Sequence, residues 1–195
     1  MRLRYYPAGL SRNTDFLALA NPFIDASAGL LYPIRPVLLI RGPSGGGTWA
    51  TVTREKLIEL LNDDLSREYQ AIIAYVNYSQ VLKGAQYMSI AKELEQHARE
   101  ELAHALTIAK QVDYLGGMPS VSPKPVRTSE KAEDMLRFDL DNETETIRNY
   151  RERVRQCEAL GEYALAEQIR EILVQEQEHQ IDLATALGEG VPGPK

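Results

Sequence analysis

The sequence predicts an all-α protein, a four-helix bundle in which one long crossover connects two helical hairpins. Four segments after residue 52 place apolar residues at alternating spacings of three and four, the period of an amphipathic helix. The connections within each half are short, whereas the middle connection is long and contains proline. Every predicted helix also carries ionisable residues in the middle of its apolar stripe, and the two halves repeat this pattern.

The predicted helices have recognisable stop signals. A glycine follows the first, third and fourth helices, and a Gly-Gly pair with a nearby proline follows the second. The crossover is expected at 120–128, between the second and third helices. The four predicted ranges are 54–82, 88–115, 129–160 and 163–187.

The chain divides into an extension, one domain and a short tail. Residues 1–51 show no sustained helical or alternating period and contain a glycine-rich stretch at 42–47, so a poorly ordered N-terminal extension is expected there. The helical pattern covers 52–190, a length suited to one well-buried domain. Residues 191–195 are expected to form a tail with no clear fifth helix before it.

Composition excludes several classes of protein. Residues 1–51 hold five Arg against two Asp, so the remainder has 17 basic and 26 acidic side chains and a formal charge of −9, which argues against binding nucleic acid. No apolar run is long enough to cross a membrane. The single cysteine, Cys157, excludes an intrachain disulfide framework, a rubredoxin-type centre and a Cys-rich zinc site. A cytoplasmic location is therefore expected.

Charged and imidazole side chains occupy stripe positions that should face the core. Burying four carboxylates together without a cation would be unfavourable by roughly several kcal/mol per ion. These positions therefore predict a bound positive species in the bundle interior. The six residues are Glu68, Glu101, His104, Glu143, Glu176 and His179.

The spacing of these residues is an internal two-fold repeat. Glu68 precedes Glu101 by 33 residues, and Glu143 precedes Glu176 by the same interval. Both halves contain Glu-x-x-His, at 101–104 and 176–179, and every element recurs after 75 residues. A single Glu-x-x-His is a weak signal, but two at matched spacing use two of the only three histidines in the chain.

This repeat predicts a metal site with two ions. Residues at i and i+3 project from one helix face, so each Glu-x-x-His offers a carboxylate and an imidazole together. Four carboxylates neutralise two divalent ions, two of them can bridge, and one imidazole can complete each metal. Oxygen and nitrogen ligands without sulfur favour iron or manganese.

Other residues near the stripe have less specific readings. Tyr75 and Tyr150 each follow a stripe glutamate by seven residues. A role beside the metals and a plain core role are equally weighted for Tyr75, whereas Tyr150 is predicted to be a core residue with a satisfied hydroxyl. His97 is predicted to be a hydrogen-bonded neighbour of the site, and Cys157 a small core residue. The charge run 148–158 is predicted to be a solvated helix face with i, i+4 pairs.

Three stretches closely resemble bacterioferritins: Leu-Gly-Gly-Met-Pro at 115–119, Glu-Asp-Met-Leu-Arg-Phe-Asp-Leu at 133–140 and Glu-Gln-Glu-His-Gln-Ile-Asp at 176–182. The likeness extends over 53–186. It implies a ferritin-like di-iron ferroxidase that oxidises Fe(II) with O₂ or H₂O₂ and holds ferric mineral in a homo-oligomeric cage. It also implies that the six stripe residues are the ligands, that Glu101 and Glu176 bridge the two irons, and that Tyr75 lies beside them.

Two departures limit what the resemblance implies. Bacterioferritins bind haem through a methionine directly after the first Glu of Glu-x-x-His, and this chain has Leu102 there, so haem is not expected. The missing fifth helix argues against the 24-subunit shell, and a Dps-like subset forms smaller shells without it. The shell size stays open.

Two other functions stay open at this stage. A di-iron oxygenase or rubrerythrin-like peroxidase would use the same ligands, although rubrerythrins have a second glutamate where this chain has Thr146. An oxygenase would also need a substrate cavity. A non-catalytic metal-binding cargo protein is the third reading, in which residues 1–51 would be an addressing peptide.

Overall fold

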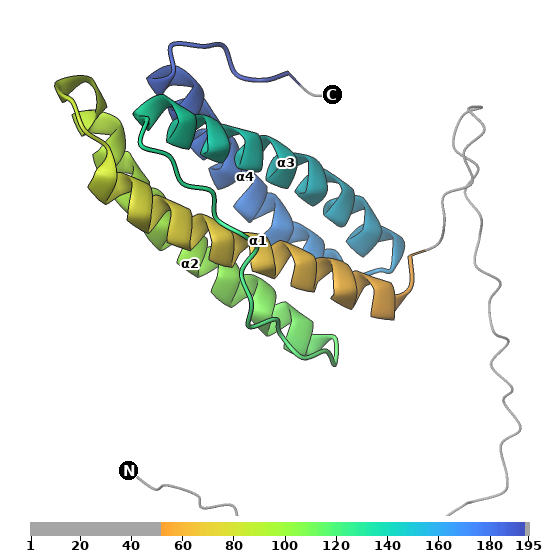
Figure 1. The fold of residues 1–195 in the computed structure, drawn as a ribbon. Coiled ribbons are helices and arrows are strands. Elements are labelled where there is room, and N and C mark those ends of the chain that lie inside the picture. The colour runs from red at the N-terminus through yellow and green to blue at the C-terminus, as the bar shows by residue number, and fades with distance from the viewer. Residues whose placement is uncertain (1–51, 194–195) are drawn as a thin grey trace, which may run out of the picture. The chain divides into compact units, whose positions relative to one another are not determined.

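The structure, a computed structural model, describes residues 52–193, and four long helices make up most of this part (Figure 1). They are α1 (Arg54–Val81), α2 (Met88–Tyr114), α3 (Ala132–Ala159) and α4 (Tyr163–Ala186), with a short 3₁₀ helix, η1 (Ala85–Tyr87), between α1 and α2. The predicted extension at 1–51 and the end of the tail, 194–195, lie outside the described residues. The domain boundaries therefore stay predictions.

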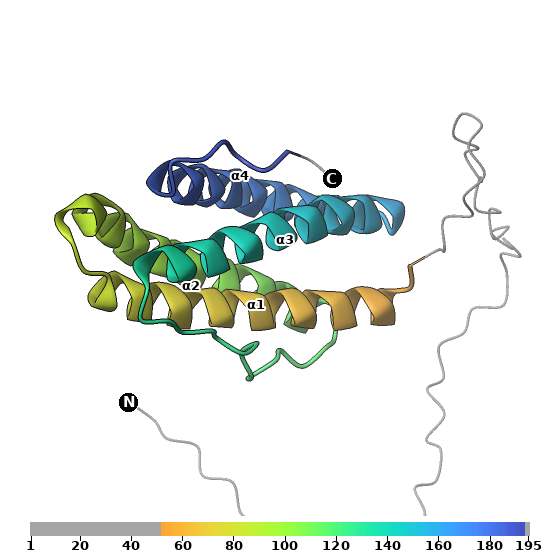
Figure 2. The same ribbon diagram turned by 45° about the horizontal axis from the view of Figure 1, so that its top comes forward.

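The helices pair as two hairpins. α1 packs mainly against α2 and α3 mainly against α4, with α1 also contacting α3 and α2 contacting α4. Figure 2 shows the two hairpins as separate layers of one bundle. The predicted all-α, ferritin-like bundle of two hairpins is therefore confirmed. Within residues 52–193 no helix follows α4, and none is long and apolar enough to span a membrane.

Helix ends follow the predicted signals closely. The Thr53 hydroxyl caps α1 by accepting from the Lys56 N–H at 3.2 Å. The predicted start of the third helix at 129 is wrong, because α3 begins at Ala132. The Ser129 hydroxyl instead accepts from the Lys131 N–H at 3.1 Å and donates to Asp134 at 2.8 Å, which holds this segment in a turn before the helix.

The crossover after α2 is bound along one face of α1 (Figures 1 and 2). Asn62 and Gln70 donate to the carbonyls of Met118 and Pro125, at 3.0 and 2.7 Å. Between them, the Ser66 carbonyl accepts from the Lys124 N–H at 2.9 Å. Asn62, Ser66 and Gln70 are spaced by four residues, so one edge of α1 supplies the partners that an irregular segment needs for its backbone.

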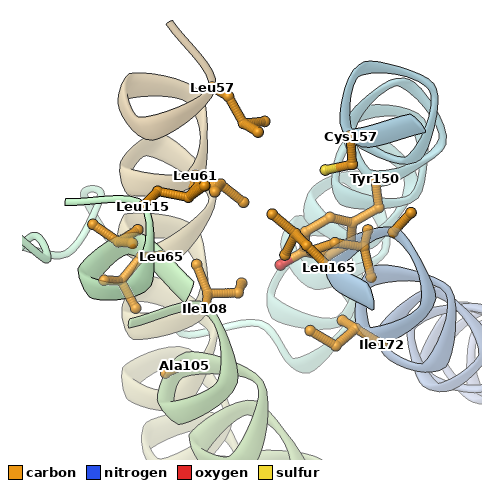
Figure 3. Close-up of a cluster of buried hydrophobic side chains, with 13 residues drawn as sticks. Leu57, Leu61, Leu65, Ala105, Ile108, Leu115, Tyr150, Cys157, Leu165 and Ile172 are labelled. Carbon is orange, nitrogen blue, oxygen red and sulfur yellow. The ribbon is translucent and has the colours of Figure 1, made fainter. Parts of the chain in front are cut away.

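The apolar core is in two parts, and Figure 3 shows the first of them. The first part includes Leu57, Leu61 and Leu65 of α1, whereas the second includes Tyr75, Tyr78 and Leu82 of the same helix. Glu68 lies on α1 between these two groups and is 1% exposed. The predicted stripe positions therefore form a buried polar layer within the bundle.

One charged residue in the predicted solvated run 148–158 is buried. Arg153 is 4% exposed, and its Nε and Nη2 donate to the two carboxylate oxygens of Asp64 on α1, at 2.6 and 3.1 Å. The prediction is wrong there because Arg153 follows Tyr150 by one turn on the core side of α3. The ion pair Arg155–Glu152 in this run has i, i+3 spacing, whereas Gln156 donates to Glu152 at 3.4 Å with the predicted i, i+4 spacing.

Candidate metal centre

The six predicted ligands come together in the polar layer. They lie on all four helices, because α1 and α3 each supply one glutamate, and α2 and α4 each supply a Glu-x-x-His. All six are 1–3% exposed. They are Glu68, Glu101, His104, Glu143, Glu176 and His179.

The six residues form two overlapping groups, and within each group the potential ligand atoms lie within 4.8 Å of one another. Glu101 and Glu176 belong to both groups. The first group adds Glu68 and His104, and the second adds Glu143 and His179. Two four-ligand sets that share two carboxylates have the composition expected of a pair of bridged metal ions.

Both histidines present the same ring nitrogen to the carboxylates. Nδ1 of His104 lies 3.3, 3.2 and 3.2 Å from oxygens of Glu68, Glu101 and Glu176, and Nδ1 of His179 lies 3.0 Å from Glu101. The Nε2 atoms face outward, His104 to the Gln175 Oε1 at 2.8 Å and His179 to the Glu100 Oε2 at 2.9 Å.

These outer contacts select a tautomer. Because each Nε2 faces a side-chain oxygen, it can donate to that oxygen, and Nδ1 would be the nitrogen left to bind a metal ion. Gln175 and Glu100 were not predicted from the sequence. Each directly precedes a shared glutamate, and the two are 75 residues apart, so the internal repeat contained the signal for both.

Several buried atoms of this cluster have no hydrogen-bond partner. They are Oε2 of Glu68, Oε1 of Glu101, both carboxylate oxygens of Glu176 and Nδ1 of His179. Unpartnered buried acceptors that point toward one another repel unless a cation lies between them. The residues present therefore fit a pair of divalent metal ions.

The electrostatics of the metal-free cluster lead to the same interpretation. Burial raises the pKa of Glu143 well above its usual value, and the nearby Glu176 and Glu101 add to the shift. Burial alone would lower the pKa of His179, but Glu101 and Glu176 outweigh it and raise that pKa to about 12. Without metals, Glu143 and His179 thus bind protons that compensate the negative charge of the buried carboxylates.

Tyr75 and Tyr150 occupy equivalent positions across the centre. The Tyr75 hydroxyl of α1 donates to Glu143 of α3, and the Tyr150 hydroxyl of α3 donates to Glu68 of α1. Both rings are fully buried. Tyr150 is a core residue with a satisfied hydroxyl, as predicted. The hydrogen bonds of the two tyrosines are equivalent, but the Tyr75 ring also lies edge-on to the rings of His97 and His179, with centroids 5.3 and 6.0 Å apart.

His97 lies next to the centre, as predicted. Its Nε2 is 3.2 Å from Asp182 Oδ2, and its ring stacks on that of His179 with centroids 4.0 Å apart. Burial, with His179 nearby, lowers the pKa of His97 to about 4, so the ring is neutral. Ligand atoms of His97, Glu100 and His179 also come within 4.8 Å of one another, but His97 and His179 already have carboxylate partners.

Cys157 is a core residue, as predicted. It is fully buried in the first apolar cluster, and burial raises the pKa of its thiol to about 12. The thiol is therefore neutral and belongs to neither ligand group.

Comparison with known proteins identifies the family. Residues 58–190 match the family model described as a ferritin-like domain. The chain belongs to this family. The ferritin-like chain is 29% identical over 141 residues to a bacterioferritin from Brucella melitensis, an overlap of 69% of this chain and 88% of that protein. The resemblance to bacterioferritins is thereby confirmed.

Solved structures of ferritin-like proteins have a similar fold. A ferritin-like di-iron carboxylate protein from Bacillus anthracis superposes with a TM-score of 0.66 at 31% identity, covering 69% of this chain and 96% of that one. A dodecameric thioferritin from Bacteroides fragilis, described as bacterioferritin-related, has a TM-score of 0.65 at 28% identity, with 71% and 88% covered.

Proposed function

We propose that this ferritin-like protein oxidises Fe(II) at a di-iron site within each chain and stores the ferric product in an oligomeric shell. The observation that carries this proposal is the overlap of two buried four-ligand groups on Glu101 and Glu176. Similarity to bacterioferritins supports iron storage as the broader function.

In the proposed site, Glu101 and Glu176 would be shared by two Fe(II) ions. Glu68 and His104 would complete one position, and Glu143 and His179 would complete the other. Four carboxylates balance two divalent charges, and the same oxygen and nitrogen donors also suit Mn(II). The two Fe(II) substrates supply two electrons, which with two protons reduce O₂ to H₂O₂ or H₂O₂ to two waters.

The alternatives receive less support from the structure. The cavity that the four carboxylates line has a volume of about 10 Å³, which accommodates one water-sized molecule and no organic substrate. Thr146, at the position of the second rubrerythrin glutamate, is a buried hydroxyl residue on the same cavity. Residues 1–51, which a cargo protein would use as its address, lie outside the described part.

The proposed oligomer is supported by exposed apolar side chains on the first hairpin. Ile73 and Val76 of α1 and Leu102 and Leu106 of α2 are 46–65% exposed. Apolar surface of this kind is commonly covered by another subunit. Leu102 offers no ligand to haem iron, so we propose a shell without haem. A reducing cytoplasmic location is part of the proposal, since the one cysteine is a buried thiol.

One experiment tests the main proposal. Metal-free protein is measured by light scattering and then loaded aerobically with Fe(II) at increasing ratios. A large closed oligomer that takes up far more than two irons per chain is the expected result. A small oligomer that stops at two irons per chain would overturn storage and favour a di-iron enzyme.

Metal binding should stabilise the fold. Two divalent ions replace protons among the buried carboxylates, and a ligand that binds only the folded state at 100 times its Kd adds about 2.7 kcal/mol. We expect the unfolding temperature of metal-free protein to rise by several degrees with Mn(II) or Co(II). Differential scanning calorimetry checks this, with Glu101→Ala as the control that should lose most of the shift.

The two tyrosines should have equal importance. Loss of an outer hydrogen bond to a metal ligand typically weakens metal affinity or activity by about 10–100-fold. Tyr75→Phe and Tyr150→Phe are each expected to slow Fe(II) oxidation by a factor in this range, as measured by stopped-flow absorbance. A large effect of one variant and none of the other would contradict the two-fold equivalence seen in the structure.

A further inference from the structure

A narrow opening connects the gap between α1 and α3 with the carboxylates. It is lined by side chains of both helices, among them Arg67, Gln70, Asn142 and Thr146, and it ends on the four glutamates of the centre. Its volume, about 10 Å³, admits one small molecule at a time. The charge of the side chains that line the opening therefore influences which reactant can pass through it.

Arg67 closes part of this opening. Its Nη2 donates to Glu145 Oε1 on α3 at 2.6 Å, so its side chain bridges the gap between the two helices. The side chain is 17% exposed, and its Nε is buried without a hydrogen-bond partner, 3.7 Å from Asp63. An N–H donor is thus held at an opening that leads to unpartnered carboxylate oxygens.

Among the residues that line the opening outside the four glutamates, Arg67 is the one charged side chain. Each carboxylate partner of Arg67 also has a second cation, since Asp63 pairs with Lys124 and Glu145 lies 3.5 Å from Arg148, so neither carboxylate is held by Arg67 alone. Fixed positive charge in a confined, poorly hydrated opening opposes the passage of a divalent cation much more than that of a neutral molecule or an anion. On the α2–α4 side, by contrast, the carboxylates of Glu100 and Asp182 face His179 and His97.

We propose that the opening between α1 and α3 passes the small oxidant, dioxygen or peroxide, and excludes divalent metal ions, and that Arg67 sets this selectivity. The inference rests on the proposed di-metal site. In the structure Arg67 donates no hydrogen bond to any of the six proposed ligands, so its effect is on access to the site and not on the electron transfer itself.

The test uses Co(II) as a redox-inactive metal and azide as a small anion. Arg67→Glu should raise the Co(II) association rate by about tenfold at low ionic strength and lower the azide affinity of the Co(II)-loaded site by a similar factor. Both effects should shrink as salt is added. Arg148→Glu is the matched control. Arg148 lies near the same Glu145, but its side chain is 67% exposed and does not line the opening, so the variant should change either value by less than twofold.

Arg67→Lys keeps the charge and should behave like the original protein. If Arg67→Glu fails to fold, Arg67→Gln replaces it in the test and should change both values in the same direction by smaller factors. Equal Co(II) rates in the Arg67 and Arg148 variants would overturn the inference and leave the proposed function intact. If the original protein does not bind two Co(II) per chain, the proposed site and this inference both fail.

Discussion

Glu101→Ala is expected to abolish fast Fe(II) oxidation, with a loss of at least about 100-fold, because outer hydrogen-bond partners of metal ligands alone contribute roughly 10–100-fold. Glu101 belongs to both ligand groups, so its removal takes an oxygen and a negative charge from both metal positions. Stopped-flow absorbance of ferric product, at two Fe(II) per chain, measures the loss. His104→Ala removes one imidazole and should also eliminate the fast phase.

Two further measurements make this result specific. Glu178→Ala removes an exposed glutamate next to His179 and should oxidise iron at the original rate. In metal-free protein, Glu101→Ala should retain the fold, because Glu176 remains as a carboxylate partner for both His104 and His179. If Glu101→Ala is folded and oxidises iron at the original rate, the assignment of the site is wrong.

The sequence was sufficient to predict the fold and the six residues of the centre. Helix ends were predicted to within a few residues because glycine stops and the Thr53 cap act locally. The clustering of these six residues was predictable because Glu68 and Glu143 interrupt apolar stripes and recur after 75 residues, so that periodicity and repetition gave independent signals.

What could not be predicted depends on which side chains meet across helices. Arg153 falls beside, and not on, the apolar stripe of its helix, and only the packing of α3 against α1 brings it to Asp64. The proton positions of His104 and His179 likewise depend on Gln175 and Glu100 from the facing helices. Periodicity places a residue on a face, but it does not identify the partner on the other helix.

The repeat also conceals a difference between the halves. Asp64 and Asp139 are 75 residues apart and both are 1–2% exposed, but the position equivalent to Arg153 is Tyr78. Asp139 has an unpartnered Oδ2, and burial raises its pKa well above the usual value, which favours the neutral acid. One half therefore stabilises its aspartate with a cation and the other with a proton.

Arg153→Met should destabilise the protein by about 3–5 kcal/mol near pH 7, because it leaves the Asp64 carboxylate buried without its cation. Burial already raises the pKa of Asp64, and Arg153 opposes that shift. Without the arginine, the folded state should bind a proton that the unfolded chain releases. A raised folded pKa gives stability that is present below the unfolded value and lost as pH rises, so the defect should be smallest near pH 4 and grow toward neutrality.

Urea unfolding measures this difference when metal-free Arg153→Met and the original protein are compared from pH 4 to pH 7. The metal centre titrates equally in both proteins and does not contribute to the difference. Arg148→Met removes an exposed partner and should change stability by no more than about 0.5 kcal/mol. The double variant Asp64→Leu with Arg153→Met should recover most of the loss, since replacing a whole buried ion pair by apolar side chains is often neutral or stabilising. A double variant as unstable as Arg153→Met alone would show that Arg153 acts through packing of its side chain, and not through the charge of Asp64.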